Sequence, residues 1–272
     1  MNTTNSVPIL TIGASSPAPH ADFVAVEEPL ELRLAFGPIE RRMRATLGVT
    51  MRTPGHDREL AAGFVLAERV VRDAADLLDI QQVEANAVRI ELHPSVPFDP
   101  DTTRRFPVSS ACGVCGTRTL DDLERDLDPV PGHTRFPEGV FHSLPGLLRE
   151  AQPTFDRTGG LHAAGLFDGS GRLLSVREDV GRHNAVDKLV GAELLAGNLP
   201  LSGRGIFVSG RAGFELIQKS VVSGAEVLGA VGAPTSLAVE AAKRFGLTLL
   251  GFVRDGRFNI YCGEERIGQP GV

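Results

Sequence analysis

The sequence of 272 residues predicts an α/β protein built from two parts that meet near Cys112. Two observations lead to this prediction. Before Cys112 the chain contains strand-like segments and one helical segment, and from Gly160 onward strand-like and helical segments alternate. Such alternation predicts a mostly parallel sheet with helices on both faces. A chain of this length accommodates one large domain or two modest ones.

The first part begins with a tail and continues as a small domain. Residues 1–21 are rich in Ser, Thr, Pro and Ala, which predicts a disordered tail, and they lack the basic start and apolar core of a secretion signal. Residues 22–107 predict a small N-terminal α/β domain. Its three expected strands are Leu30–Gly37, Ala45–Thr53 and Ala87–Leu92, and apolar and polar residues alternate in the first of them.

The same domain contains one expected helix and ends in a linker. The helix covers residues 57–71, after the break at Pro54-Gly55, with Asp57 as its expected N-cap. Residues 93–107 are dense in proline and predict a linker. Residues 108–118, which hold the first two cysteines among small side chains, predict a mobile loop.

Residues 119–272 form the predicted larger C-terminal domain. Helical spacing appears first over residues 119–127 and 142–153, and two strands joined by Gly169-Ser170-Gly171 follow over 161–168 and 173–179. The next expected elements are helix 182–197, strand 205–210, helix 213–224, strand 227–232 and helix 235–246. Thr235 is the expected N-cap of the last helix, and glycine ends each helix.

The chain ends in an expected hairpin. Strands over residues 247–253 and 257–262 flank Asp255-Gly256, a dipeptide favoured in type I′ turns. The hairpin predicts one antiparallel strand at the edge of the sheet.

Composition excludes several classes of function. With 42% hydrophobic and 23% charged residues the chain resembles a soluble globular protein, and its net charge of −6 gives no basic excess for general nucleic-acid binding. Its apolar runs are shorter than the roughly 20 residues of a membrane span. Three cysteines are too few for a disulfide scaffold, so a reducing, cytoplasmic setting is expected.

The segment SSACGVCG, from Ser109 to Gly116, pairs Cys112 with Cys115. Such a pair is used in metal binding, in dithiol redox chemistry and in sulfur transfer. A structural zinc site needs about four ligands, and of the other cysteines and histidines His162 is the best placed. A zinc nucleoside deaminase needs H-x-E, but His162 is followed by two alanines and the cysteines come before it. No metal site is therefore predicted.

Dithiol redox chemistry and sulfur transfer remain. A redox pair usually follows the first strand of a βαβ unit, whereas this one follows a proline-rich linker. In sulfur transfer, one thiolate accepts a sulfane sulfur as a persulfide, and a second thiol attacks the inner sulfur to release the outer one. Small residues around the pair suit a loop that moves between donor and acceptor. A pair of unreactive, half-buried cysteines in a turn is the plainest alternative.

Three further segments carry charge where strands end. REDVGRHNAVDK (177–188) places Arg182, His183 and Lys188 at a strand-to-helix turn, which in α/β sheets lies at the ligand-binding edge. VSGRAGFELIQKS (208–220) has the same form, and GFVRDGRFNIY (251–261) carries arginines at a hairpin tip. Each segment is also compatible with an ordinary solvated turn. If the first segment is part of a site, we expect Arg182, His183 and Lys188 either to bind phosphate or to lower a thiol pKa.

In order along the chain, these segments resemble the FdhD family of sulfur carriers that make formate dehydrogenase active. The matching stretches are SSACGVCG, REDVGRHNAVDK, VSGRAGFELIQKS, GAPTSLAVEAAKRFGLTLLGFVRDGR and, less sharply, MRTPGHDRELAAGF. They cover roughly Arg33 to Cys262. The resemblance implies a cytidine-deaminase-like C-terminal domain, with a mixed sheet, helices on both faces and no catalytic zinc.

The resemblance also implies an activity and its residues. The protein would be a sulfurtransferase in which Cys112 carries a persulfide and Cys115 assists. The sulfur would go to molybdenum bis(molybdopterin guanine dinucleotide), which GDP would mimic. The segment implied to bind that cofactor consists of Phe252, Val253, Arg254, Asp255, Gly256 and Arg257.

Partners follow from the same resemblance. A cysteine desulfurase would donate the sulfur, the catalytic subunit of a formate dehydrogenase would receive the cofactor, and the chain would pair as a homodimer. One departure stands out, because Gly213 occupies the position where relatives carry a serine after SGR-x. The competing hypothesis is a thiol-disulfide or zinc-binding module that scaffolds another enzyme.

Overall fold

The computed structural model describes residues 2–13, 18–99, 127–130, 132 and 134–268. The cysteine pair Cys112 and Cys115, the predicted loop over residues 108–118 and nearly all of the helix expected over residues 119–127 lie outside the described residues. Within the described ranges, no helix combines the length and the apolar character that crossing a membrane requires.

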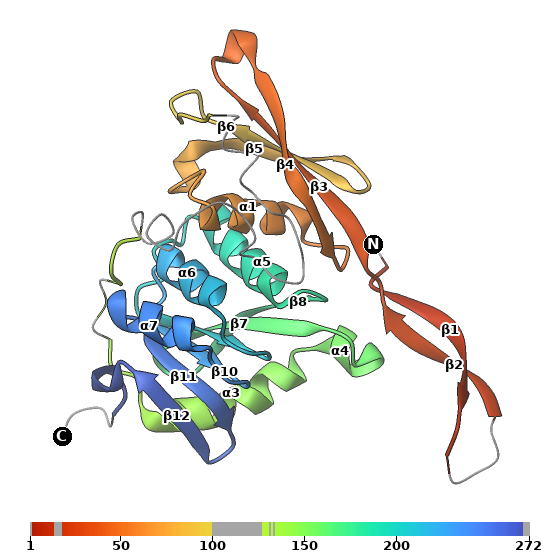
Figure 1. Ribbon diagram of the computed structural model, residues 1–272, viewed down its shortest axis with the longest axis vertical. Helices are drawn as coiled ribbons and strands as arrows, with labels where there is room; N and C mark the ends of the chain where they lie inside the picture. The colour runs from red at the N-terminus through yellow and green to blue at the C-terminus, as the bar shows by residue number, and fades with distance from the viewer. Residues whose placement is uncertain (1, 14–17, 100–126, 131, 133, 269–272) are drawn as a thin grey trace.

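Two sheets enclose a layer of helices (Figure 1). The smaller sheet has the strand order β4-β3-β6-β5 and consists of β3 (Glu28–Phe36), β4 (Met43–Arg52), β5 (Leu77–Glu84) and β6 (Ala87–Leu92). The helices between the sheets are α1 (Asp57–Ala67), α5 (Arg182–Leu195), α6 (Phe214–Ser223) and α7 (Ser236–Arg244). Helix α3 (Glu138–Glu150) covers the far face of the larger sheet, and α4 (Pro153–Thr158) follows it. The predicted α/β class is confirmed.

The larger sheet is mixed, with the strand order β12-β11-β10-β9-β7-β8. Its parallel core consists of β9 (Arg204–Val208), β10 (Val227–Ala230) and β11 (Thr248–Arg254). The other three are antiparallel to their neighbours: β7 (His162–Asp168), β8 (Leu173–Asp179) and β12 (Arg257–Cys262). The expectation of a mostly parallel sheet is therefore wrong, because the tight turn after β7 forms a hairpin and β7 then lies between β8 and β9. The deaminase-like likeness stays a prediction.

Alternate residues of the larger sheet pack into two cores. Leu166 faces the helix layer, in a buried cluster that continues through α1 to Leu32 and Ile90 of the smaller sheet. Its neighbour Phe167 faces the other way and packs against Phe136 and Phe141, with ring centroids 5.9 and 6.1 Å away. The two predicted parts of the chain therefore share one continuous core.

Helices α1 and α5 cross in close contact at two glycines. A Cβ atom added to Gly63 would lie 2.0 Å from the backbone oxygen of Asp187, and one added to Gly191 would lie 1.8 Å from that of Glu59. Side chains at either position would force the helices apart. Because both positions are glycine, α1 of the N-terminal part and α5 of the C-terminal part can pack in backbone contact at the centre of the helix layer.

The predicted disordered tail over residues 1–21 is corrected by the structure. Strands β1 (Thr4–Thr11) and β2 (Ala18–Ala25) pair as an antiparallel arm that extends from the body of the molecule (Figure 1). The arm is tied at its base, where the guanidinium of Arg157 lies 4.7 Å from the centroid of the Phe23 ring. The composition of these residues, rich in Ser and Pro, predicts disorder, but the segments also contain residues that favour strands, and these form the observed arm.

Three smaller expectations also differ. Helix α1 begins at Asp57, but its N-cap is His56 in a left-handed conformation (φ 59°), and Asp57 instead pairs with Arg52 at 3.0 Å. The final hairpin has positive φ at Gly256 but not at Asp255, so its turn is not type I′. Strand β5 was not anticipated, because Ile80 is buried while Gln81 and Gln82 are exposed and the apolar alternation is weak.

Other local expectations are confirmed. The hydroxyl of Thr235 accepts a hydrogen bond from the backbone N–H of Ala238, which caps α7. Gly224 closes α6 in the left-handed conformation. Short 3-10 turns complete the structure at Ile39–Arg41, Ala74–Asp76 and Glu264–Arg266.

Candidate functional site

The candidate site is the edge of the larger sheet at which β9, β10 and β11 end. Because these strands are parallel, their carboxyl ends meet there, where open α/β sheets bind ligands. Strands β7 and β8 bring His162 and Asp179 to the same edge, where the two residues pair in register. The edge thus gathers residues from five strands.

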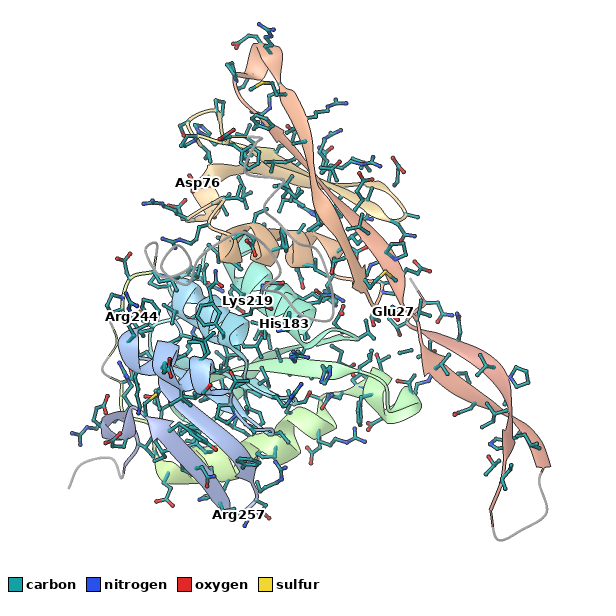
Figure 2. All side chains as sticks on the ribbon, in the orientation of Figure 1. Glu27, Asp76, His183, Lys219, Arg244 and Arg257 are labelled. Atoms are coloured by element: carbon teal, nitrogen blue, oxygen red, sulfur yellow. The ribbon has the colours of Figure 1, made fainter. Side chains whose placement is uncertain are left out.

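The predicted guanine-dinucleotide segment lies at this edge, in the hairpin of β11 and β12. The backbone N–H of Phe252 donates to the carbonyl of Gly232 at 3.1 Å, and Nη1 of Arg254 donates to the carbonyl of Val231 at 2.6 Å. Val253 is buried and anchors the segment in the core below. Figure 2 shows Arg257 at the hairpin tip. The exposed members of the segment are Phe252, Arg254, Asp255, Gly256 and Arg257.

Lys188, one of the cations expected at the site, is buried at the junction of the two parts. Its ammonium pairs with Asp179 at 2.7 Å and donates to the carbonyls of Thr53 at 2.8 Å and Glu178 at 3.4 Å. The Lys188 side chain is 1% exposed. These contacts use all three ammonium N–H groups, so Lys188 has no donor left for a phosphate.

Asp179 holds the junction from the other side. Its carboxylate accepts hydrogen bonds from the backbone N–H of Thr53 at 3.1 Å, from that of Gly181 at 2.8 Å and from Nδ2 of Asn184 at 3.1 Å. These bonds fix the turn into α5 against the end of β4. Asp179 is therefore a structural residue, fully satisfied where it is buried.

Arg177 makes a second connection between the two parts. Its Nε and Nη2 donate to the two carboxylate oxygens of Glu59, at 2.5 and 3.0 Å. Burial raises the pKa of Glu59, but hydrogen bonds from His56 and Arg177 outweigh it and bring the pKa to about 2. The neighbouring Glu178 accepts from the backbone N–H groups of Thr154 and Phe155 and so fixes the start of α4.

His183 faces the helix layer beside the site. Its Nε2 lies 3.1 Å from Oε2 of Glu215. Burial, together with the positive charges of Lys219 and Arg182, lowers the pKa of His183 to about 3. The imidazole is thus neutral at neutral pH and donates an N–H to the carboxylate. Lys219, labelled with His183 in Figure 2, is paired with Asp187 at 2.5 Å.

Arg182 differs from every other charge in this cluster. Its Nε is buried without a hydrogen-bond partner, and its guanidinium forms no ion pair with any residue that the structure describes. A Cβ atom on Gly210 would lie 3.3 Å from the His162 ring and 3.7 Å from Cδ of Arg182, so the two side chains flank that glycine. Burial and the charge of Arg182 both lower the pKa of His162. An unpaired guanidinium at the strand ends is suited to bind an anion.

The Ser209-to-Glu215 loop contributes backbone groups and Arg211 to the edge. Gly213 is the N-cap of α6, and no side-chain oxygen caps that helix. The loop is held by the N–H of Ala212, which donates to the carbonyl of Ala233 at 3.2 Å. Arg211 is exposed beside it. Gly213 stands where the family resemblance leads us to expect a serine, and the start of α6 therefore has no side-chain cap.

A cavity of about 580 Å³ opens at this edge, on the side of the sheet that α3 covers. Its wall combines residues from α3, α4 and the strand ends, among them Gln152, Phe155 and His162. The sequence does not single out Gln152 and Phe155, because a single glutamine and a single phenylalanine form no motif. The helical spacing over residues 142–153 covers Gln152, whereas no pattern in the sequence predicts α4, which carries Phe155.

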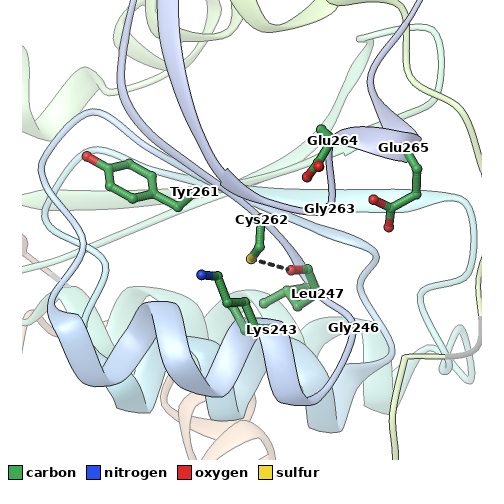
Figure 3. A pocket seen from close by; sticks show the side chains of 9 residues that line it. Lys243, Gly246, Leu247, Tyr261, Cys262, Gly263, Glu264 and Glu265 are labelled. Atoms are coloured by element: carbon green, nitrogen blue, oxygen red, sulfur yellow. Dashed lines mark hydrogen bonds between the residues drawn. The ribbon is translucent and has the colours of Figure 1, made fainter.

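Cys262 lies in a different place, at a cavity of about 400 Å³ between α7 and β12 (Figure 3). Its thiol donates to the carbonyl of Leu247 at 3.2 Å, and burial raises the thiol pKa. The thiolate is the reactive form of cysteine. Cys262 is therefore a poor acceptor for sulfur. Within the described ranges, no group of three or more His, Cys, Asp and Glu side chains is placed to hold a metal ion.

Comparisons with known proteins agree in one respect. Residues 25–268 match the FdhD/NarQ family. A protein named sulfur carrier protein FdhD from Streptomyces avermitilis is 47% identical over 270 residues, which cover 94% of this chain and 92% of that protein. A protein of the same name from Saccharolobus solfataricus is 44% identical over 250 residues, covering 91% of each chain.

A solved structure shares the fold. It is a crystal structure of a protein named as a formate dehydrogenase accessory protein from Desulfotalea psychrophila. The two superpose with a TM-score of 0.77 at 24% identity, over 98% of this chain and 100% of that one.

Proposed function

The chain belongs to the FdhD/NarQ family, and we propose that it is a sulfur carrier that supplies formate dehydrogenase with a sulfurated molybdenum cofactor. The observation that carries the proposal is the relation to proteins named sulfur carriers, at 47% identity over 94% of this chain, together with the Cys112–Cys115 pair. The pair supplies the thiols that such a carrier needs.

In the first step, sulfur moves between cysteines. The Cys112 thiolate attacks the outer sulfur of a persulfide on a cysteine desulfurase. The bond between the two donor sulfurs breaks, the donor cysteine leaves as a thiolate, and Cys112 becomes the persulfide. One sulfur–sulfur bond forms as another breaks, so no external oxidant or reductant takes part.

In the second step, the outer sulfur leaves. The Cys115 thiolate attacks the sulfur of Cys112, a disulfide forms, and the outer sulfur departs with the bonding electrons as sulfide for molybdenum. The substrate is molybdenum bis(molybdopterin guanine dinucleotide). A cellular dithiol then reduces the Cys112–Cys115 disulfide and restores the carrier.

Charge at the sheet edge supports binding of that substrate. Arg254 and Arg257 are exposed on the hairpin, and the guanidinium of Arg182 has no ion pair within the described residues. Arginine binds phosphate oxygens through paired N–H groups, so these residues suit the pyrophosphate of a guanine dinucleotide, or GDP in its place. We place the carrier in the cytoplasm as a homodimer, with formate dehydrogenase as the recipient.

The test is sulfur loading followed by mass spectrometry. The full chain is incubated with a cysteine desulfurase and cysteine, and the protein mass is measured before and after reduction. We expect a gain of one sulfur in the unaltered protein, none in Cys112→Ala, and an unchanged gain in Cys262→Ala. Stoichiometric zinc without any gain of sulfur would instead support the scaffold module.

A binding measurement complements this test. Arg254→Ala is expected to weaken GDP binding, whereas Arg41→Ala, an exposed arginine far from the edge, is expected to leave it unchanged. A protein that binds no GDP at all would fit the scaffold module and not the carrier.

A further inference from the structure

The arm formed by β1 and β2 extends away from the body of the molecule (Figure 1). Among the described residues its two strands pair only with each other. An isolated two-stranded hairpin has little stability in water, because it has too few neighbours to cover its apolar side chains. Residues 25–268 match the family, so the arm lies almost entirely before the matched part. The proposed function assigns the arm no role.

The register of the arm divides its side chains between two faces. Residues paired across the strands lie on the same face, and neighbours along a strand lie on opposite faces. Phe23 pairs with Ser6, and Ala21 pairs with Pro8. Leu10 lies on the same side as Pro8, two residues further along β1. We call this side the uncharged face, and it consists of Ser6, Pro8, Leu10, Ala21 and Phe23.

The uncharged face is open to solvent over most of its length. Leu10 is 59% exposed and Phe23 is 41% exposed, and Pro8 and Ala21 are exposed as well. None of the five residues of this face is ionisable, whereas Asp22 lies on the opposite face of the arm. A contiguous apolar surface of this kind marks a site of interaction on a soluble protein.

The chain itself covers only the root of the arm. The guanidinium of Arg157, in α4, lies 4.7 Å from the centroid of the Phe23 ring. A Cβ atom added to Gly160 would lie 3.6 Å from the Cβ atom of Ala25, so the end of β2 rests against the segment after α4. Both contacts are close to the root, and Leu10 lies toward the tip. The outer part of the uncharged face needs a cover from outside the chain.

The lack of charge on this face favours a second copy of the chain as that cover. Interfaces of permanent homodimers are apolar, and charged residues are depleted in their cores. Partners that meet briefly use complementary charges to steer the encounter and to select one another. The uncharged face offers no charge for such steering, so it suits a contact that persists.

The area of the arm indicates how two copies meet. Each strand has eight residues, so the arm is roughly 26 Å long and about 10 Å wide, and one face covers roughly 260 Å². Two arms packed only on each other would bury roughly 500 Å², which is below the roughly 1,000 Å² of a stable interface. If each arm lies on the body of the other copy, four such surfaces are covered and roughly 1,000 Å² is buried.

We propose that two copies of this chain interlock through their arms, so that the uncharged face of each arm lies on the body of the other copy across a twofold axis. The inference rests on the homodimer of the proposed function and assigns it an interface. The root of the arm contacts α4, and Phe155 of α4 lines the 580 Å³ cavity. The arm therefore connects the contact between copies to a wall of the candidate site.

Two matched substitutions in the full chain test the contact. Leu10→Asp places a charge on the uncharged face, and Thr11→Asp places the same charge on the next residue, which is exposed on the opposite face. Dissociation constants of the dimer are measured by analytical ultracentrifugation over a range of protein concentrations. We expect Leu10→Asp to raise the dissociation constant roughly a hundredfold, because a symmetric dimer loses the buried leucine twice. Thr11→Asp should leave it nearly unchanged.

Hydrogen exchange of the arm provides a second measurement. Backbone amides of residues 4–11 and 20–25 are followed above and below the dissociation constant of the unaltered chain. We expect their protection to increase as the dimer forms, and to stay low at both concentrations in Leu10→Asp. Circular dichroism should show the same unfolding midpoint for the body of both variants, because the substituted side chains lie outside the shared core.

The outcomes separate this inference from the proposed function. Equal dissociation constants for the two variants, or arm protection that does not depend on protein concentration, would overturn the inference and leave the homodimer standing. An unaltered chain that is monomeric at every concentration would overturn both. A failure of sulfur loading at Cys112 in the unaltered chain would defeat the proposed carrier, while the measurements on the arm would stand.

Discussion

Two regions of this molecule use the same kinds of charged residues in opposite ways. At the junction between its N-terminal and C-terminal parts, buried charges are paired, as Lys188 is with Asp179 and Arg52 with Asp57. At the sheet edge, where Arg182 begins the helix that carries Lys188, Arg182 has no ion pair within the described residues. One segment, residues 177–188, supplies both regions. Pairing, and not charge alone, therefore separates the residues that hold the fold together from the residues that are available to a ligand.

Removing the Lys188 ammonium from the paired region should lower stability the most. Lys188→Met leaves the Asp179 carboxylate buried without its cation, which costs about 3–5 kcal/mol of stability in comparable cases. We expect a large fall in the denaturant midpoint, measured by circular dichroism. Lys243→Met, on the exposed face of α7, should change stability by less than about 0.5 kcal/mol. Equal effects of the two substitutions would contradict the structural role of Lys188.

A middle-sized effect concerns pH. The folded pKa of His183, about 3, lies below its usual value of 6.5, so below pH 6.5 the unfolded chain takes up a proton that the folded chain does not. Stability therefore falls as pH decreases from about 6.5 toward 3, by about 2 kcal/mol between about pH 7.5 and about pH 5. His183→Gln should flatten this dependence in urea unfolding at a series of pH values. An unchanged slope would show that His183 titrates normally.

The smallest effect on stability is expected at the unpaired residue. Arg182→Gln removes a guanidinium that has no ion pair, so the free energy of unfolding should change by less than about 0.5 kcal/mol. Its affinity for pyrophosphate should nevertheless fall roughly tenfold, since a charge-assisted contact is lost. Stability from urea unfolding and affinity from calorimetry check the two halves. A marked loss of stability without loss of binding would move Arg182 to the paired region.

The sequence predicted the C-terminal elements well, because apolar periodicity, Thr235 and Gly224 are local signals. It also predicted the final hairpin, which adds β12 as an antiparallel strand at the edge of the sheet. The contacts of Lys188 could not be predicted from the sequence, because the Thr53 carbonyl to which it donates lies 135 residues away in the chain. Gln152 was missed for a related reason: an unpaired amide becomes evident only after the residues around it are packed.

The glycine contact between α1 and α5 has one more consequence. Because Gly63 and Gly191 bring the two helices into backbone contact inside one shared core, neither half of the chain is a module that can be exchanged or produced alone. A protease that cut the chain between Leu92 and Leu127 would leave the two fragments associated. Recombination that joined halves from distant relatives would have to preserve both glycines together.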